Sequence, residues 1–157
     1  MVSQEVRYFD KYPYSELKSQ DERSCFKICS YQYAYPDAEN EYDADWHKNY
    51  LYVTLPSFQA EIDDIMLEGR YLECYLDELN QFLSLKKRKV MFEPTEPFFS
   101  LGFSFNRIKK VEVSGFVQYP VGNGSQLEFE FETDLAYIER FAEGLQKILQ
   151  QFPVKDQ

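Results

Sequence analysis

The chain of 157 residues has little that would build a metal centre, a disulfide framework or a membrane anchor. It contains one His and three Cys, whereas a structural zinc site needs about four such ligands and a disulfide framework needs an even number of Cys. No apolar run approaches the ~20 residues that span a bilayer. The first residues also lack the basic start and apolar stretch of a signal peptide. We therefore expect a cytoplasmic protein without metal or cofactor.

The cysteines are expected to be reduced thiols. Cys25 and Cys29 fall on one predicted strand, where a rise of ~3.3 Å per residue separates their Cα atoms by about 13 Å. A disulfide requires a much shorter separation, so these two residues are not a disulfide pair.

The composition is that of one folded domain over residues 1–157. Apolar residues make up 44% of the chain and aromatic residues 18%, which excludes intrinsic disorder. The net charge is −10. All of it lies between Asp37 and Glu78, where twelve acidic residues meet only two basic ones. This disfavours direct binding of nucleic acid, which needs a basic surface. The acidic segment fits either a solvated surface or a surface that attracts a basic partner.

The hydrophobic pattern predicts five stretches of strand and two helices. Residues 1–24 are expected to be irregular, with Pro13 breaking any regular element. Period-two alternation predicts strands, with a bulge near residues 29–30, a prolyl interruption at Pro56 and a Gly- and Asn-rich turn at residues 121–125. The strand ranges are 25–35, 50–62, 99–105, 111–119 and 127–131.

Two amphipathic helices are expected, over residues 69–85 and 134–151. The first has apolar residues at the three-and-four spacing from Leu72 to Leu83, and the second from Leu135 to Phe152. Asp134 is a good N-cap, and Pro153 ends the second helix. Short connections between strands imply antiparallel pairing. The predicted fold is α+β, a single domain with a largely antiparallel sheet and the two helices packed on one face.

The stretch EYDADWHKNY, residues 41–50, has the densest set of polar candidates. Asp43 and Asp45 have the first spacing of a calcium loop, but the required Gly and Glu are missing. Asp45 and His47 could form an acid-base couple, but no Ser or Cys nucleophile in a local motif accompanies them. A third interpretation is structural, with Trp46 anchoring the start of a strand against the core. We predict this third interpretation and no catalytic residue.

The stretch LEFEFETD, residues 127–134, places three carboxylates on one face of a strand. The preceding strand offers Glu112, Ser114, Phe116 and Gln118 opposite them, and Lys109 and Lys110 follow near one end. Such an acidic ladder is either the solvated face of a half-covered sheet or a docking surface for Lys and Arg. We define the acidic ladder as Glu128, Glu130 and Glu132.

The chain is also rich in tyrosine, with 13 residues of this type. Tyr combines apolar area with a hydrogen-bonding tip and is favoured at protein interfaces. Many of these rings could equally cover a sheet face under a helix. The basic clusters at residues 86–89 and 107–110 are short and flank turns, as is typical of solvated ends.

The order of motifs resembles the WapI family of bacterial immunity proteins. YDADW (residues 42–46) precedes the strand LYVTL, and the helix LECYLDELNQFL precedes FEP (residues 92–94) and an aromatic strand. A terminal QFP (residues 151–153) follows the last helix. The resemblance covers a core of residues 25–153. The Tyr-rich N-terminus and the acidic connection between the third-strand region and the first helix depart from the pattern.

The resemblance implies an immunity protein that neutralises the C-terminal domain of a wall-associated, repeat-bearing toxin. Such toxins belong to polymorphic and contact-dependent inhibition systems, and their toxin domains are often nucleases with basic surfaces. Inhibition would be steric and electrostatic and would need no enzyme activity. The expected toxin contacts are Tyr42, Asp43, Asp45, Glu61, Asp63, Asp64, Glu128, Glu130 and Glu132. The expected structural motif residues are Trp46, Phe92, Glu93 and Pro94. The alternative is a ligand-binding or enzymatic α+β domain with a pocket on its aromatic sheet face.

Overall fold

The computed structural model describes residues 4–106 and 110–155. The helices and strands are α1 Gln4–Lys11, β1 Tyr14–Lys18, β2 Cys25–Tyr33, α2 Glu41–Ala44, β3 Trp46–Leu55, β4 Phe58–Glu68, α3 Gly69–Leu83, β5 Lys89–Phe92, β6 Phe99–Phe105, β7 Val111–Tyr119, β8 Ser125–Thr133 and α4 Leu135–Gln151. The α+β class and the antiparallel pairing of the strands are confirmed. Within the described part of the chain, no helix is both long and apolar enough to cross a membrane.

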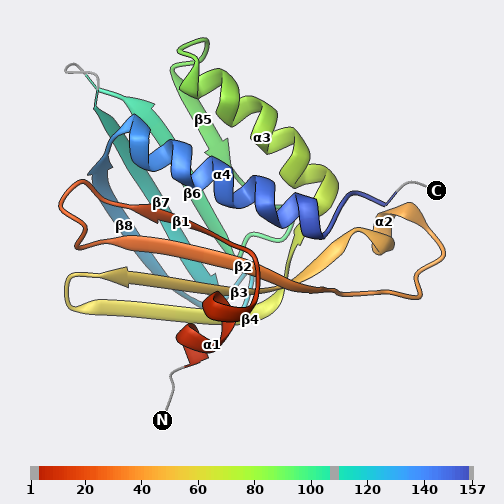
Figure 1. Cartoon of the computed structure of the whole chain (residues 1–157). Helices are drawn as coiled ribbons and strands as arrows, with labels where there is room; N and C mark the ends of the chain where they lie inside the picture. Colours follow the sequence, from red (N-terminus) through yellow and green to blue (C-terminus); the bar gives the residue numbers. More distant parts are fainter. Residues whose placement is uncertain (1–3, 107–109, 156–157) are drawn as a thin grey trace.

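The strands form two antiparallel sheets rather than one. Sheet A has the order β1-β2-β3-β4, and sheet B has the order β5-β6-β7-β8. In each half of the chain a four-stranded meander is followed by a long helix, α3 after sheet A and α4 after sheet B. The two halves share this order although no repeat is recognisable in the sequence. Figure 1 shows α3 and α4 side by side in front of sheet B, with sheet A running below them.

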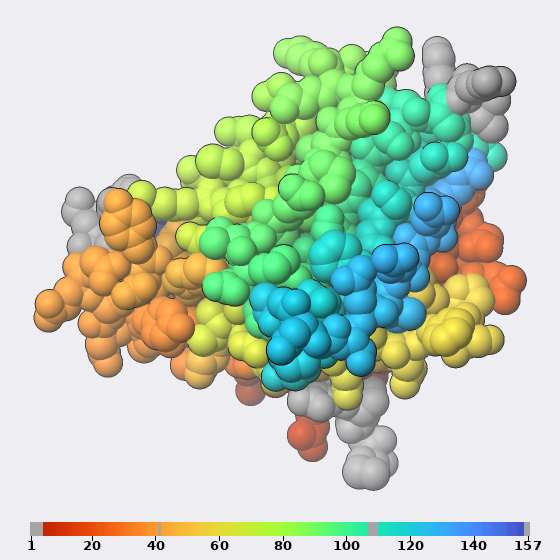
Figure 2. All heavy atoms as spheres, turned by 180° about the vertical axis from the view of Figure 1, so that it is seen from behind, coloured from red at the N-terminus to blue at the C-terminus, as the bar shows by residue number. Residues whose placement is uncertain are grey.

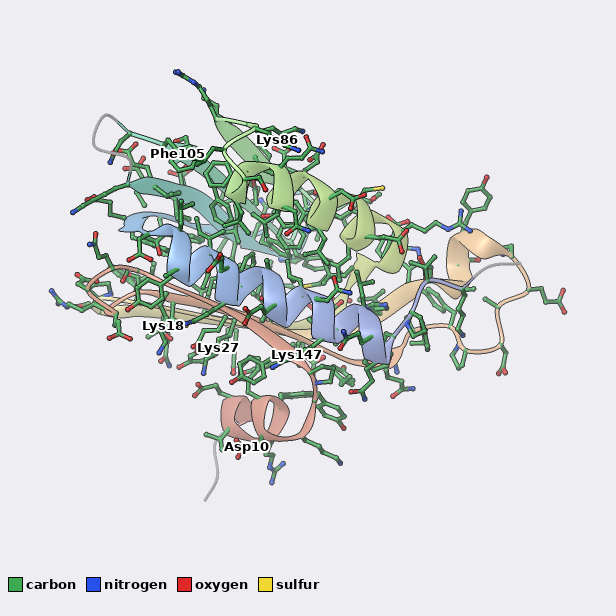
Figure 3. The ribbon with its side chains drawn as sticks, turned by 45° about the horizontal axis from the view of Figure 1, so that its top comes forward. Asp10, Lys18, Lys27, Lys86, Phe105 and Lys147 are labelled. Carbon is green, nitrogen blue, oxygen red and sulfur yellow. The ribbon has the colours of Figure 1, made fainter. Side chains whose placement is uncertain are left out.

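One hydrophobic core lies between the two sheets and the two long helices. Phe26 of sheet A contacts Phe99 of sheet B with ring centroids 5.1 Å apart, and Phe141 of α4 lies 6.2 Å from Phe26. At the end of α3, Phe82 stacks on Phe105 with ring centroids 4.4 Å apart. Phe105 is labelled in Figure 3. The aromatic inner face of β6 is therefore filled by helices. The alternative expectation of a ligand pocket therefore does not apply to this inner face, where Phe99, Leu101 and Phe103 are at most 1% exposed.

The two long helices follow the predicted pattern closely. The apolar stripe of α3, from Leu72 to Phe82, is buried, as is most of the stripe of α4. The side chain of Asp134 caps α4 by accepting a hydrogen bond of 3.1 Å from the backbone N–H of Tyr137. Strand β7 has the predicted bounds, and β8 extends the prediction by two residues at each end.

The N-terminal segment was expected to be irregular, but residues 4–11 form α1 and residues 14–18 form β1. Pro13 lies between these two elements. The inward side chains of β1 are Ser15 and Leu17, so the strand lacks the apolar alternation that marks a strand in a sequence. Ser15 is small because α4 packs directly on it. A Cβ on Gly144 of α4 would lie 2.5 Å from the Cα of Ser15.

Pro56 lies in a turn between two strands, whereas one strand over residues 50–62 with an interruption at Pro56 was expected. Leu55 and Phe58 pair across the β3–β4 hairpin, which leaves Pro56 and Ser57 as its two-residue loop. Ser57 has a φ of 69°. Proline at the first central position followed by a positive φ is the pattern of a type II turn. The strand therefore reverses direction at this proline.

A second, smaller aromatic cluster covers the outer face of sheet A. Phe9 of α1 packs against Cys29 and Tyr50, with Tyr8, Tyr12, Tyr31 and Tyr52 around them. Tyr8 stacks on Tyr50 with ring centroids 4.4 Å apart. Figure 3 shows α1, labelled at Asp10, beneath sheet A on the side opposite the long helices. Many of the N-terminal tyrosines thus attach α1 to the sheet.

Candidate toxin-binding surface

The stretch 41–50 is a strand entry, but its buried anchor is not Trp46. Helix α2 is capped by Asn40, whose side chain accepts a hydrogen bond of 2.9 Å from the backbone N–H of Asp43. Strand β3 begins at Trp46. The Trp46 ring is only partly buried, whereas Asp45 and His47 on either side are 1% and 0% exposed. The expectation of a core tryptophan is therefore wrong, and the two polar neighbours are inside instead.

Asp45 is a structural residue and not an accessible toxin contact as expected. Its carboxylate accepts hydrogen bonds from the backbone N–H groups of Arg70 (2.6 Å) and Lys155 (3.2 Å). The first bond satisfies an amide at the start of α3, where the helix itself offers no acceptor, and the second holds the segment that follows α4. A Cβ on Gly69 would lie 2.8 Å from this carboxylate, so glycine makes room for it. Burial raises the pKa of the Asp45 carboxyl, while the two N–H donors lower it.

His47 does not pair with Asp45. Its Nδ1 lies 2.9 Å from the hydroxyl of Ser30, which also accepts a hydrogen bond from the side chain of Asn49 (2.9 Å). The imidazole is enclosed by the rings of Tyr33 and Phe152. Burial lowers the pKa of His47 to about 4. This Ser-His contact is completely buried, so a substrate cannot reach it.

Within residues 4–106 and 110–155, no group of three or more His, Cys, Asp or Glu side chains is placed to hold a metal ion. The exposed Asp43 lies on α2 beside Tyr42, which is 75% exposed. The loop that carries α2 projects from one side of the molecule (Figure 1).

Glu61 and Asp63 lie on the outer face of sheet A and bind tyrosines of their own chain. Asp63 accepts hydrogen bonds of 2.6 Å from the hydroxyls of Tyr8 and Tyr31, and Glu61 accepts one from Tyr50. Burial, reinforced by the Asp63 carboxylate, raises the pKa of Tyr31. These two acids are exposed, but part of their hydrogen-bonding capacity already holds α1 and β3.

The acidic ladder lies on the outer face of sheet B, as expected. The register places Glu132 opposite Glu112, Glu130 opposite Ser114 and Glu128 opposite Phe116. Among the described residues, the ladder forms one ion pair, between Glu132 and Lys110 at 3.7 Å. Lys109 lies outside the described residues. Like charges that face each other across a sheet repel, so Glu112 adds to the negative potential of this face.

No described helix covers the outer face of sheet B. Figure 2 shows this side of the molecule, with β7 and β8 at the surface. The loop that carries α2 projects at one side of the same view, at residues 35–45. The ladder strand and the loop that carries α2 are thus both visible from this side of the molecule. Glu61 and Asp63 lie on a different face, and Asp45 is inside.

The FEP motif attaches sheet B to α3. Phe92 is completely buried and stacks on Tyr75 with ring centroids 4.1 Å apart. The backbone N–H of Glu93 donates a hydrogen bond of 2.5 Å to the hydroxyl of Tyr71, and Pro94 is buried beside it. The side chain of Glu93 is exposed. The motif therefore packs the start of sheet B against α3.

A hollow of about 340 Å³, which we call the aromatic hollow, lies where the two sheets meet. The side chains that give it its character are Tyr35, Trp46, Phe98, Tyr119, Asp64 and Glu96. Asp64 was expected as a contact, whereas Glu96, Phe98 and Tyr119 were not identified from the sequence. They come from segments far apart in the chain, and no local pattern joins them.

Comparison with known proteins identifies both the sequence family and the fold. The model of the Immunity protein WapI-like family matches residues 16–153. A chain of the crystal structures of Trypanosoma bruciei MRP1/MRP2 is similar with a TM-score of 0.50 and 13% identity, over 94% of this chain and 90% of that chain. At this identity the similarity concerns the fold alone. The comparison with curated protein sequences gives no match.

Proposed function

Because the chain belongs to the WapI-like immunity protein family, whose model matches residues 16–153, we propose that it neutralises the C-terminal domain of a cognate wall-associated toxin by binding it stoichiometrically. The proposed place of action is the cytoplasm of the producing cell. Binding occludes the active surface of the toxin, and no catalytic group of the immunity protein takes part.

The observation that carries the proposal is the uncovered acidic face of sheet B. Three ladder carboxylates and Glu112 lie on one open sheet surface, and within the described residues only Lys110 pairs with the ladder. A folded protein tolerates such uncompensated charge at some loss of stability. The charge becomes useful when a basic surface docks on it, because complementary potentials accelerate association and exclude wrong partners.

We infer that the toxin domain is basic and that a nuclease fits best. An enzyme that binds the phosphate backbone needs Lys and Arg along its substrate path. An acidic sheet face competes for the same cations and blocks that path. The exposed Tyr42 and Asp43 on α2 extend the surface at one side, where Tyr contributes contact area that is desolvated on binding.

The first experiment identifies the partner. The tagged immunity protein is used to capture proteins from its native lysate at low and high salt. We expect recovery of the C-terminal fragment of a large repeat protein, released by high salt. The recombinant toxin domain is then tested for binding and for loss of its toxicity in the presence of the immunity protein. A toxin domain that remains active when saturated with this protein would refute the proposal.

The ladder is then tested with two variants of equal net charge. The first changes Glu128, Glu130 and Glu132 to Gln. The control is Glu73→Gln, Asp77→Asn, Glu139→Gln, which removes three exposed carboxylates from α3 and α4 on the helical side of the molecule. We expect the ladder variant to lower the association rate with the toxin domain by about tenfold at low salt and to flatten its salt dependence. The control should change the rate much less. Equal association rates for the two variants would show that the ladder is not part of the interface.

A further inference from the structure

The aromatic hollow combines partly exposed rings with unpaired carboxylates. Tyr35 and Tyr119 are 44% and 51% exposed, and Trp46, which lines the same hollow, is partly buried. Phe98 forms the floor at 6% exposure and stacks on Tyr119 with ring centroids 6.2 Å apart. The hollow is thus lined by rings on several sides and open to solvent.

Two carboxylates enter the same hollow. Asp64 and Glu96 line it from β4 and from the loop before β6. Within the described residues neither forms an ion pair. Asp64 accepts a hydrogen bond of 2.7 Å from the backbone N–H of Ile65, which leaves its second oxygen without a donor among the described residues. The backbone carbonyl of Glu96 accepts a hydrogen bond from the backbone N–H of Phe98, and its carboxylate has no hydrogen bond with a described residue.

No Lys or Arg of the described residues lines this hollow. Elsewhere the chain places its own cations over its rings. The ammonium of Lys155 lies 3.9 Å from the ring of Tyr33, and that of Lys27 lies 5.1 Å from the ring of Phe9. Among the described residues, the rings of the hollow combine with carboxylates and have no cation placed over them.

Rings around two carboxylates suit one kind of side chain best. A guanidinium stacks flat on aromatic faces, which attract it through their quadrupole, and donates paired hydrogen bonds to carboxylates. An apolar side chain would leave both carboxylates partly desolvated without a partner, which is unfavourable. A carboxylate-bearing side chain would be repelled.

We propose that the aromatic hollow is the receptor for one arginine side chain of the toxin domain. This proposal rests on the proposed function for the identity of the partner. The position supports it, since the hollow lies at the end of β7 on the side of the molecule that carries the acidic ladder. In Figure 2 the turn at residues 119–124 meets β4 and the segment before β6 on this face. The ladder attracts the basic surface of the toxin domain, and the hollow fixes the position of that surface by binding a single side chain.

The first test needs no toxin. Trp46 is the only tryptophan of the chain, so its fluorescence reports on the hollow alone. The probe is the capped tripeptide Gly-Arg-Gly, and the control probe is the same peptide with neutral citrulline. We expect the arginine peptide to change the fluorescence saturably with a roughly millimolar Kd, as suits one side chain. Equal responses to both peptides, or no saturable response, would overturn the proposal.

Variants assign the response to the proposed groups. Asp64→Asn with Glu96→Gln should weaken binding of the arginine peptide about fivefold or more, and Tyr35→Leu with Tyr119→Leu should weaken it similarly. Both pairs change partly or fully exposed groups, so folding is expected to persist and is checked by thermal unfolding. The matched control, Glu73→Gln with Asp77→Asn, removes two exposed charges of α3 that belong to neither the hollow nor the ladder. A loss of the same size in this control would show a general charge effect and overturn the assignment.

The toxin domain separates this proposal from the proposed function. If the wild-type protein binds and inhibits the toxin domain, and the hollow variants do so with equal dissociation rates, the hollow is not the receptor and the immunity function stands. If the hollow is used, the same variants raise the dissociation rate at least about tenfold. If the toxin domain is not inhibited by the wild type, the proposed function fails, whatever the result with the arginine peptide.

Discussion

At the scale of single residues, two buried polar groups show how the YDADW region is used. Asp45, which lies between α2 and β3, accepts hydrogen bonds from the backbone N–H groups of Arg70 in α3 and of Lys155 after α4. His47 sits two residues later inside the sheet, bonded to Ser30. Both are titratable groups in a dry environment, where the charged form of each is disfavoured. The region thus stabilises the fold, and only its exposed members are accessible for the proposed contact with the toxin domain.

His47 predicts an acid-dependent loss of stability. Burial holds its pKa near 4, below the ordinary value of 6.5. Between these two pH values the unfolded chain binds a proton that the folded chain does not. The contribution of this residue is therefore complete above pH 6.5 and lost as the pH falls to about 4. Linkage gives about 3 kcal/mol for this window.

The measurement compares urea unfolding of the wild type and of His47→Asn at several pH values. Asparagine keeps a polar group near the position of Nδ1 but does not titrate. The variant is expected to be less stable at pH 7 and to lose less stability between pH 6.5 and 4. The raised pKa of Asp45 acts in the opposite direction in both proteins and cancels in the comparison. If the free energy of unfolding changes with pH in the same way in both proteins, His47 is not the source of the acid-dependent loss of stability.

At the scale of elements, α1 is held on sheet A by rings rather than by backbone pairing. Phe9 is 9% exposed and covers Cys29, which is completely buried. The Tyr8 hydroxyl adds a hydrogen bond to Asp63. An eight-residue helix is unstable alone, so its stability depends on this packing. Detachment of α1 would expose Cys29.

Cysteine labelling tests this attachment. Burial raises the pKa of the Cys29 thiol to about 12, whereas Cys74 is exposed on α3. In the wild type, iodoacetamide should label Cys74 fast and Cys29 slowest. Phe9→Ala should accelerate labelling of Cys29 by tenfold or more, on the order expected for a lost buried ring, and leave Cys74 unchanged.

The control for this experiment is Asp10→Ala, which changes an exposed residue of the same helix. Peptide mass spectrometry after quenching measures each cysteine separately. If Cys29 is labelled at the wild-type rate in Phe9→Ala, then α1 does not protect it, and the described packing of the helix is not the barrier to the reagent.

At the scale of the whole molecule, the net charge of −10 acts on stability as well as on association. This charge lies in the segment from Asp37 to Glu78, which contains α2, β3, β4 and most of α3, and few of its carboxylates form ion pairs among the described residues. Self-repulsion of this kind destabilises the compact state. Binding of a basic toxin would therefore relieve repulsion within the immunity protein itself.

Salt should stabilise the free protein. Raising NaCl from ~10 mM to ~150 mM shortens the Debye length from about 30 Å to about 8 Å, which screens the repulsion. A gain of about 1 kcal/mol corresponds to a rise in Tm of about 2–4 °C for a chain of this size. The control variant Glu73→Gln, Asp77→Asn, Glu139→Gln, with three fewer negative charges, should show a smaller rise in Tm. A Tm that falls with added NaCl would contradict a repulsive net effect.

The sequence alone determined the elements whose signal is local. Alternation of apolar and polar residues in β6, β7 and β8 fixes which side chains face the core, and this alternation is sufficient to predict that the acidic ladder lies on the outer face. The stripes of α3 and α4 and the cap at Asp134 depend on residues within a few positions of each other. The order of short motifs indicated the family.

Only the tertiary structure decided the rest, because those features depend on residues far apart in the chain. Asp45 is buried because backbone groups 25 and 110 residues away come to its carboxylate. Strand β1 lacks an apolar pattern because α4 packs closely on it, with Gly144 of the helix against Ser15 of the strand. The division into two sheets and the aromatic hollow likewise arise where distant segments pack. Packing of this kind leaves no periodic signal in a single sequence.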